Sequence, residues 1–371
     1  MSETSAVANE RSRTGVSAPR KILIVRLGAM GDIIHALPAA MLLKCAFPKT
    51  ELGWVVEKRW KDLLAWKIEE HAFPDRLHLV DTRGWRKKIV SAEVRKEAMA
   101  AIRELRAAKY DIAIDFQGAL KSAVISALSG ARTRYGFAEP WEKPASLFYS
   151  HPVATSEAHV VAQNLDLAMS VLHAREAQVD GNAFCPIQMA DVSLHGWAKR
   201  YMEELQFVNG FVMINPGAGW GAKQWPTDRY AEVAKALAQD GIPCLVNYGP
   251  GEEQMAEQIQ LATRGHAAAG KFSIAELTAI IQRARLFIGG DTGPMHMAAL
   301  FHVPVVAIFG PTDPARNGPY ATESMVLRDA SSITSHKRNR NTEAGLLNIT
   351  TEQVLRAARE LLRLNQEGAR A

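Results

Sequence analysis

The stretch KILIVRLGAMGD, residues Lys21–Asp32, joins a short apolar run to a turn that contains two glycines. The run Lys21–Leu27 is partly β-branched and has the length of a strand, which predicts a buried strand. The turn Gly28–Gly31 follows, and Asp32–Ala46 has helical spacing, with Pro38 marking a kink or a new first turn. A strand, a glycine turn and a helix in this order predict one unit of a parallel sheet covered by helices.

The same order of elements recurs along the chain. After a looser stretch at Ala183–Pro186, a new strand at Phe211–Asn215 starts a second series, which a helix at Thr351–Leu364 closes, capped by Thr350 or Thr351. We therefore predict an α/β protein with two Rossmann-like halves. Its parts are a disordered leader at residues 1–19, an N-terminal domain at 20–185, a C-terminal domain at 186–350, and a helix and tail at 351–371 that can pack back on the N-terminal domain.

Composition narrows the function classes. The chain has 371 residues, of which 47% are hydrophobic and 22% charged, as is usual for soluble globular proteins. The leader lacks the apolar core of a signal peptide, and three scattered cysteines predict buried thiols in a reducing compartment, the cytoplasm. A net charge of +5 without a recognition motif does not indicate nucleic-acid binding. It fits an anionic small substrate or a membrane surface.

The strongest candidate site is LFIGGDTGPMH, residues Leu286–His296. A strand ends at a double glycine, and a helix begins with Pro294 in its first turn and Asp291 or Thr292 as its cap. The free N–H groups and the positive end of the helix dipole suit a phosphate or pyrophosphate. An ordinary capped turn has the same outline, but His296, one turn into the helix, favours a functional site.

The turn at Gly28–Asp32 is the second candidate. Asp32 stands where a carboxylate is either a helix cap or a general base, and the position alone favours the cap. The turn lacks the full Gly-x-Gly-x-x-Gly of a dinucleotide site, and apart from Glu57 no acidic residue ends the next strand. The dinucleotide fingerprint is therefore weak.

Two further strand ends carry glycines and charge. In NPGAGWGAKQWP, Asn215–Pro226, the glycines let the backbone approach an anion and Lys223 offers a positive charge to a leaving phosphate, unless this is a surface loop anchored by Trp225. In YGPGEE, Tyr248–Glu253, Glu252 can bond ribose hydroxyls or compensate a helix dipole. Sites on both halves predict a cleft with a phosphorylated donor on one domain and an acceptor on the other.

Several motifs together resemble glycosyltransferase family 9. They are Met30-Gly31-Asp32, DFQGALKS at Asp115–Ser122, KQWP at Lys223–Pro226, DTGPMH at Asp291–His296 and FGPTDP at Phe309–Pro314. The similarity runs from about Lys21 to Tyr320. WRK at Trp85–Lys87, Glu139-Pro140 and PASLFY at Pro144–Tyr149 resemble the heptosyltransferases of this family that act in lipopolysaccharide inner-core synthesis.

The resemblance implies a GT-B fold, in which two Rossmann-like domains face each other across a cleft. It implies an inverting transferase that uses no metal or other cofactor. The donor would be ADP-heptose, a co-substrate that carries L-glycero-D-manno-heptose, and the acceptor a Kdo residue of Kdo-lipid A. Such an enzyme would be cytoplasmic and peripheral at the inner face of the inner membrane, where anionic lipids attract basic surfaces.

The resemblance also assigns roles to individual residues. Asp32 would be the catalytic base. Donor-binding residues would be Lys223, Asp291, Thr292, Gly293 and His296 at the diphosphate, Glu252 at the ribose, Phe272 at the adenosine, and Ala218 and Gly219 through backbone N–H groups. Acceptor-binding residues would be Arg83, Arg86, Lys87, Lys88, Gln117 and Lys121, the four clustered basic residues meeting carboxylates and phosphates. A charge run of this kind is otherwise an ordinary solvated face.

Other interpretations stay open. Another family 9 transferase would use a different sugar donor or acceptor. An NAD-dependent oxidoreductase with paired Rossmann units would have the full glycine fingerprint, which is absent. A non-catalytic sugar-binding module would also have a two-lobed cleft, but it would not need a base at Asp32.

Overall fold

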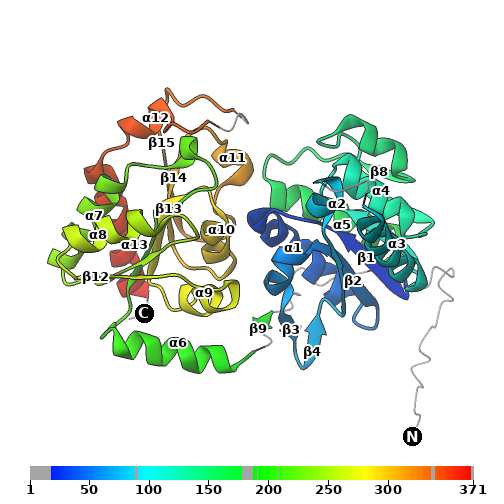
Figure 1. The fold of residues 1–371 in the computed structure, drawn as a ribbon, viewed down its shortest axis with the longest axis horizontal. Helices are drawn as coiled ribbons and strands as arrows, with labels where there is room; N and C mark the ends of the chain where they lie inside the picture. The colour runs from blue at the N-terminus through cyan, green and yellow to red at the C-terminus, as the bar shows by residue number, and fades with distance from the viewer. Residues whose placement is uncertain are drawn as a thin grey trace, which may run out of the picture.

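The computed structural model describes residues 18–87, 91–177, 187–189, 191–207, 209–335 and 339–368. Two α/β halves lie side by side (Figure 1), each built on a six-stranded parallel sheet. In the numbering of each half, both sheets have the strand order 3-2-1-4-5-6 of a Rossmann domain. The prediction of two Rossmann-like halves is therefore confirmed.

The first sheet has the order β5-β2-β1-β6-β7-β8. Alternate residues of β1 point to opposite faces: Ile22 and Ile24 pack with α1 and α5, while Leu23 and Val25 pack under α3. A small antiparallel sheet, β4-β3-β9, extends this half. Its elements are β1 (Lys21–Val25), α1 (Met30–Ala46), β2 (Glu51–Glu57), η1 (Lys58–Leu64), β3 (Trp66–Ile68), β4 (His71–Phe73), β5 (Arg76–Val80), α2 (Thr82–Lys87), α3 (Ala92–Ala107), β6 (Ile112–Asp115), α4 (Leu120–Leu128), β7 (Thr133–Phe137), η2 (Lys143–Phe148), β8 (His151–Val153), α5 (Val160–Ala174) and β9 (Gln188–Met189).

The second sheet has the order β12-β11-β10-β13-β14-β15. Residues of α7, α8 and α13 share a core with one face of this sheet, and residues of α9 and α10 share a core with the other. Its elements are α6 (Ser193–Glu204), β10 (Val212–Asn215), η3 (Gly221–Lys223), α7 (Thr227–Gln239), β11 (Cys244–Asn247), α8 (Glu253–Ala262), β12 (Ala267–Gly270), α9 (Ile274–Ile281), β13 (Leu286–Gly290), α10 (Gly293–Leu300), β14 (Val305–Phe309), α11 (Pro314–Asn317), β15 (Ser324–Arg328), α12 (Ala344–Asn348) and α13 (Thr351–Gly368).

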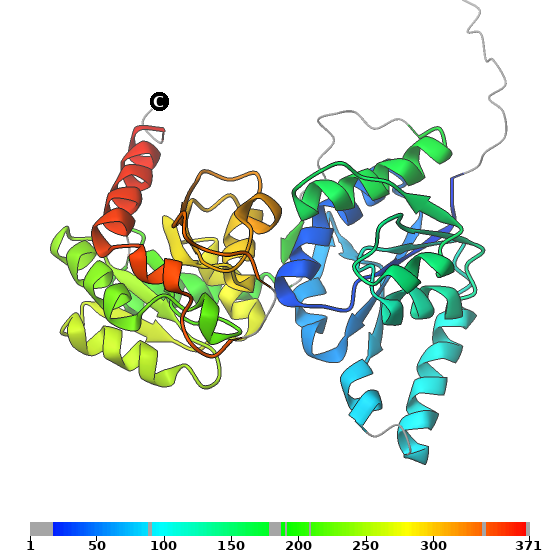
Figure 2. The same ribbon diagram turned by 90° about the horizontal axis from the view of Figure 1, so that it is seen from above.

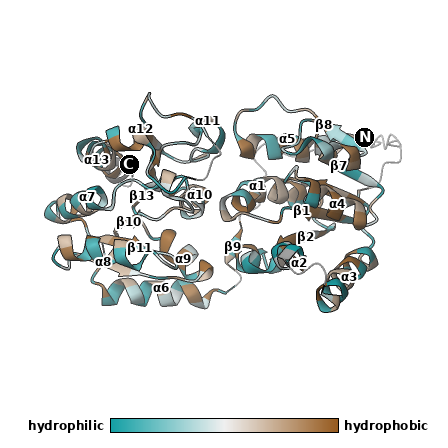
Figure 3. Cartoon of the chain, turned by 45° about the horizontal axis from the view of Figure 1, so that its top comes forward, coloured by the Kyte–Doolittle hydropathy of each residue, from teal (hydrophilic) through white to brown (hydrophobic). Residues whose placement is uncertain are grey.

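The halves are joined through one continuous hydrophobic core. That core includes Ile33 and Leu37 of α1 together with Met295 and Ala298 of α10. Strongly hydrophobic residues run through the central strands and α1, while the outer helices mix both kinds (Figure 3). Within the described residues no helix is long and apolar enough to cross a membrane.

Two expectations need correction. The described part of α13 packs on the second half and not on the N-terminal domain, because its apolar stripe, including Val354, Ala358 and Leu361, completes the core under α7 (Figure 2). The three cysteines are not all free thiols: Cys45 is disulfide-bonded, whereas Cys244 is free and buried. The leader up to residue 17 lies outside the described residues.

Candidate active site

The two glycine turns meet at the interface of the halves. β1 and β13 are central strands, and the helices that follow them, α1 and α10, pack against each other (Figure 1). A Cβ atom added at Gly31 would lie 2.6 Å from Cδ2 of His296, and one at Gly293 would lie 2.5 Å from the Met30 side chain. Glycine at both positions therefore allows the two helix starts to approach this closely.

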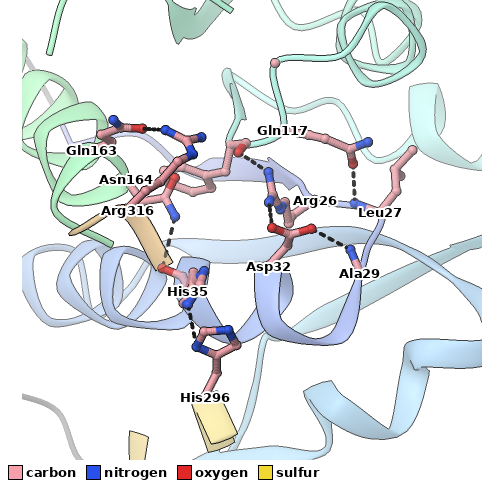
Figure 4. Close-up of polar contacts among 12 residues, drawn as sticks. Arg26, Leu27, Ala29, Asp32, His35, Gln117, Gln163, Asn164, His296 and Arg316 are labelled. Carbon is pink, nitrogen blue, oxygen red and sulfur yellow. Dashed lines mark hydrogen bonds and ion pairs between the residues drawn. The ribbon is translucent and has the colours of Figure 1, made fainter. Parts of the chain in front are cut away.

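Asp32 is both a cap and an accessible carboxylate. Its Oδ2 accepts a hydrogen bond of 2.9 Å from the Ala29 N–H, and its Oδ1 lies 2.6 Å from Nη2 of Arg26 (Figure 4). Arg26 is buried and also donates to the Phe116 carbonyl at 2.5 Å. The helix begins two residues earlier than predicted, with Ala29 as its N-cap, so Asp32 is its third residue and makes the return contact of a capping box instead of being the N-cap itself. The Asp32 side chain is still 45% exposed, so a substrate hydroxyl could reach it.

The motif Asp115–Ser122 fixes the neighbouring loop. Asp115 is fully buried and accepts hydrogen bonds from the Tyr149 hydroxyl at 2.7 Å and the Ser122 hydroxyl at 2.8 Å. Burial raises the pKa of the Asp115 carboxyl, against the lowering effect of these bonds. Oε1 of Gln117 accepts from the Leu27 N–H at 3.0 Å, which ties this loop to the end of β1. The side-chain amide oxygen of Gln117 therefore already accepts a hydrogen bond, while the Lys121 side chain is exposed.

The start of α10 has backbone donors to offer. Thr292 is the N-cap residue, but its side chain makes no capping bond and instead donates to the Gly290 carbonyl at 3.3 Å. One of the two expected caps, Thr292, is thus the N-cap residue, although neither its side chain nor that of Asp291, which pairs with Lys223 and His296, makes a capping bond. N–H groups left without a side-chain cap at a helix start are suited to an anion.

Asp291 joins Lys223 to His296. Its Oδ2 lies 2.6 Å from Nζ of Lys223, and its Oδ1 lies 3.1 Å from Nε2 of His296. Burial alone would raise the pKa of the Asp291 carboxyl, but the hydrogen bond from His296 and the charge of Lys223 hold that pKa well below its usual range. Asp291 is therefore ionised at neutral pH, and the charge of Lys223 is already partly compensated.

A histidine pair continues this network into the first half. Nδ1 of His296 lies 2.9 Å from Nε2 of His35 on α1 (Figure 4). Because Nε2 of His296 donates to the Asp291 carboxylate, a neutral His296 accepts at Nδ1, and His35 must donate from Nε2. Nδ1 of His35 is then unprotonated, and it has no partner among the described residues. Lys223, Asp291, His296 and His35 thus form one chain of polar contacts across the interface.

Three further contacts surround the histidine pair. Nε2 of His159 bonds to the Gly318 carbonyl at 3.0 Å, and Nη1 of Arg316 donates to Oε1 of Gln163 at 3.4 Å, both between the halves (Figure 4 shows the second). Nδ2 of Asn164 donates to the His35 carbonyl at 3.0 Å. Sequence reasoning missed these residues. A lone histidine or asparagine on a helix gives no signal until the fold supplies its partner.

The donor-side residues gather at the ends of β10, β11 and β12. Glu252 is the N-cap residue of α8, and its Oε2 accepts from the Gly249 N–H at 2.7 Å, as expected for a carboxylate at a helix start. A Cβ atom on Gly217 would lie 2.1 Å from the Glu252 carboxyl carbon, so a larger residue there would displace the carboxylate from this position. Ala218 is half-buried, and the exposed Gly219 faces open space.

Two more segments border the donor side. Phe272 packs edge-on against Tyr201, with ring centroids 5.7 Å apart, and is half-buried. Residues 331–341 are described in part: the Asn339 carbonyl accepts from the Ala222 N–H at 3.1 Å, beside Lys223. This loop therefore borders the donor-side turn.

The basic cluster lies on the first half. Arg83 and Arg86 are exposed on α2, which follows β5 at the carboxyl edge of the first sheet. Lys87 ends α2, and Lys88 lies outside the described residues. The structure thus brings Asp32, Lys223, Asp291 and His296 to one interface and leaves Arg83 and Arg86 on the surface.

Comparison with known proteins gives consistent results. A family model described as Glycosyltransferase family 9 (heptosyltransferase) matches residues 98–347. Lipopolysaccharide heptosyltransferase 1 of Escherichia coli strain K12 is 29% identical over 83% of this chain and 93% of that protein, and its Pseudomonas aeruginosa namesake is 27% identical over 83% of each.

Solved structures agree on the architecture. E. coli heptosyltransferase WaaC with ADP superposes with a TM-score of 0.74 and 26% identity, covering 92% of this chain and 99% of that one. E. coli ADP-heptose lps heptosyltransferase II gives a TM-score of 0.71 at 20% identity, over 93% and 99% of the two chains, which supports the fold alone. The GT-B fold implied by the sequence motifs is confirmed.

Proposed function

The chain belongs to glycosyltransferase family 9, the heptosyltransferase family, and from this premise we propose that it transfers L-glycero-D-manno-heptose from ADP-heptose to a Kdo residue of Kdo-lipid A in inner-core synthesis. The observation that carries the proposal is the meeting of the two turns. The accessible carboxylate of Asp32 lies on one side of the interface, and the start of α10 with Lys223 lies on the other.

In the proposed reaction Asp32 removes the proton of an acceptor hydroxyl. The hydroxyl oxygen forms a bond to C1 of the heptose from the face opposite the diphosphate, so the configuration inverts. The bond from C1 to the phosphate oxygen breaks, and ADP leaves with the electron pair. Asp32 suits this role because its side chain is half-exposed while Arg26 and the Ala29 N–H fix its position.

The leaving diphosphate needs positive charge, which the second half offers. The first-turn N–H groups of α10, at Thr292 and Gly293, would bind the phosphate oxygens, because no side chain caps them. When the donor binds, the Lys223 ammonium would contact both the Asp291 carboxylate and the diphosphate, and so add positive charge. We assign the ribose to Glu252, the adenosine contact to Phe272, and backbone contacts to Ala218 and Gly219. No metal or cofactor enters this proposal.

The acceptor would bind the first half. Arg83, Arg86, Lys87 and Lys88 would meet the Kdo carboxylates and lipid A phosphates, and Gln117 and Lys121 would line the approach to Asp32. The same basic surface would dock the enzyme on the anionic inner face of the inner membrane.

The deciding experiment incubates the protein with ADP-heptose and Kdo-lipid A and measures ADP release together with product mass. We expect one ADP for each heptose added to the acceptor. ADP-glucose and Kdo-lipid A lacking the attacked hydroxyl serve as controls. Release of ADP without a heptosylated product, or preferential use of another sugar nucleotide, would overturn the proposal.

A further inference from the structure

A cavity of about 330 Å³ lies between the first sheet and α3, on the face opposite α1. On α3, Ala98, Ala101, Ile102 and Leu105 line it with helical spacing, and Val124 on α4 lines the opposite wall. Of the four α3 residues only Leu105 is buried; the others are half-buried. The apolar stripe of α3 therefore faces space instead of packed side chains, in a volume typical of ligand sites.

One polar atom in the wall of this cavity has no partner. Trp85 on α2 lines the cavity, and its Nε1 is buried without a hydrogen-bond acceptor among the described residues. Buried donors without an acceptor are rare in folded proteins. An oxygen atom on a bound molecule would satisfy this donor once the indole turns Nε1 toward the cavity, so the cavity is suited to a chain that is apolar but carries an acceptor oxygen.

The surroundings of the cavity are cationic. Lys121, which lines it, is exposed, and Arg83 and Arg86 flank Trp85 on α2. The one carboxylate in the lining, Glu104, is paired with Nδ1 of His78 at 3.1 Å. A ligand with an apolar chain and an anionic head therefore matches both the lining and its charged neighbours.

We propose that this cavity holds one acyl chain of the anionic lipid acceptor. The ester or amide oxygen of that chain accepts a hydrogen bond from Nε1 of Trp85, and the anionic head group faces Arg83, Arg86 and Lys121. This inference rests on the proposed function, which supplies a lipid acceptor, and it adds a binding site for the part of the acceptor that takes no part in sugar transfer.

The first test measures binding without turnover. Calorimetry measures the binding of n-alkyl phosphates with four to twelve carbons to the full-length protein. Each alkyl phosphate is kept below its critical micelle concentration. Affinity should rise about fourfold for each added methylene, as for transfer of a methylene out of water, and then level off when the chain fills the cavity. No dependence on chain length, or a rise that never levels off, would overturn the proposal, since the second pattern is surface adsorption.

Matched variants test whether the alkyl chain binds in the cavity. Ala101→Phe fills the space from α3 and Val124→Phe fills it from α4, and both should move the plateau to shorter chains. Ala100→Phe, the same change one position along on the exposed face of α3, should leave the series unchanged. Equal behaviour of Ala100→Phe and Ala101→Phe would overturn the proposal. Two walls are tested, so a variant that fails to fold leaves the other decisive.

The acceptor oxygen and the lipid need their own measurements. Trp85→Phe should weaken dodecanoyl glycerol phosphate roughly threefold to tenfold, as for loss of a hydrogen bond, and spare dodecyl phosphate, which has no carbonyl. In Ala101→Phe the KM for Kdo-lipid A should rise, and the KM for its deacylated form should not. If transfer fails with both acceptors while alkyl binding persists, the proposed function fails and the alkyl site stands. If Ala101→Phe leaves the ratio of the KM for Kdo-lipid A to the KM for its deacylated form unchanged, the cavity does not hold the acyl chain.

Discussion

Nε2 of His35 lies 2.9 Å from Nδ1 of His296, although the two residues are 261 positions apart in the sequence. The pair joins α1 to α10, so the helix that carries Asp32 and the helix proposed to bind the diphosphate share one buried polar contact. A proton taken up by His35 would place a positive charge in the buried core, close to His159 and Arg26. The contact therefore favours a neutral His35.

This pair should make stability depend on pH. Burial, together with His296, His159 and Arg26, holds the pKa of His35 well below its ordinary value. Below about pH 6.5 the unfolded chain takes up a proton that the folded chain does not. The free energy of unfolding therefore decreases as the pH is lowered, by at most about 1.4 kcal/mol per pH unit for this group. Urea unfolding at pH 7.5 and 5.5 measures the fall.

The matched comparison isolates His35. The pKa values of His78 and His159 are lowered by burial as well, so the wild type alone is not diagnostic. His35→Gln should lose less stability than the wild type between the two pH values, and His266→Gln, at an exposed position, should behave like the wild type. Equal losses in His35→Gln and the wild type would contradict the assignment.

Asp32→Asn tests the proposed base. The amide keeps the shape of the side chain but cannot accept the proton, so kcat should fall by about a hundredfold to ten-thousandfold. ADP affinity, measured by calorimetry, should stay close to the wild-type value because ADP would bind the other half. Asp62→Asn, an exposed acid-to-amide change, is the control. Equal losses of turnover and ADP binding would remove Asp32 from the role of base.

Lys223 makes a structural ion pair with Asp291 and has a proposed role in donor binding, and the two can be separated by mutation. Its side chain is 15% exposed and that of Asp291 is 7% exposed, so Lys223→Met leaves a buried carboxylate without its cation. Breaking such a pair costs up to about 3–5 kcal/mol of unfolding free energy. The double variant Lys223→Met with Asp291→Asn should recover much of that stability but not the ADP affinity. Recovery of both would reduce Lys223 to a structural role.

Local patterns in the sequence predicted the fold and the two glycine turns that meet at the interface. Apolar runs that end in glycine turns mark the strand ends, and these depend only on neighbouring residues, so β1 with α1 and β13 with α10 could be located. Elements with weaker signals were missed: β12 is Ala-Ala-Ala-Gly, and β15 carries no glycine turn at its end. The packing of α13 on the second half depends on which surface is left uncovered, which the sequence does not state.

The pairings inside the site could not be predicted. Lys223 was expected beside a phosphate, but its partner Asp291 lies 68 positions away and is reached only after the Asn215–Pro226 loop folds. Asp291 was interpreted as a cap because local spacing permits it, and a buried lysine and histidine compete successfully for the same carboxylate. Long-range ionic contacts of this kind are fixed by the sheet order.

Turnover should persist in EDTA. In the proposed site the first-turn N–H groups of α10 and the Lys223 ammonium supply the positive charge that the departing ADP needs. Initial rates in a chelator and in added Mg²⁺ should therefore agree, with a Mg²⁺-dependent transferase as the control in the same buffer. A loss of rate that Mg²⁺ restores would mean that these groups do not suffice.

Arg83→Gln with Arg86→Gln tests the acceptor surface. Both side chains are exposed, so their attraction to an anionic acceptor acts through solvent and is screened within about 10 Å at 0.1 M salt. The KM for Kdo-lipid A should rise several-fold at low salt, and the difference from the wild type should shrink at high salt. The KM for ADP-heptose should not change. Arg103→Gln with Arg106→Gln on α3 removes the same charge from an exposed position in the same half. If the Arg103 and Arg106 variant raises the acceptor KM equally, net charge and not the α2 surface attracts the acceptor. If the Arg83 and Arg86 variant changes only the donor KM, Arg83 and Arg86 do not bind the acceptor.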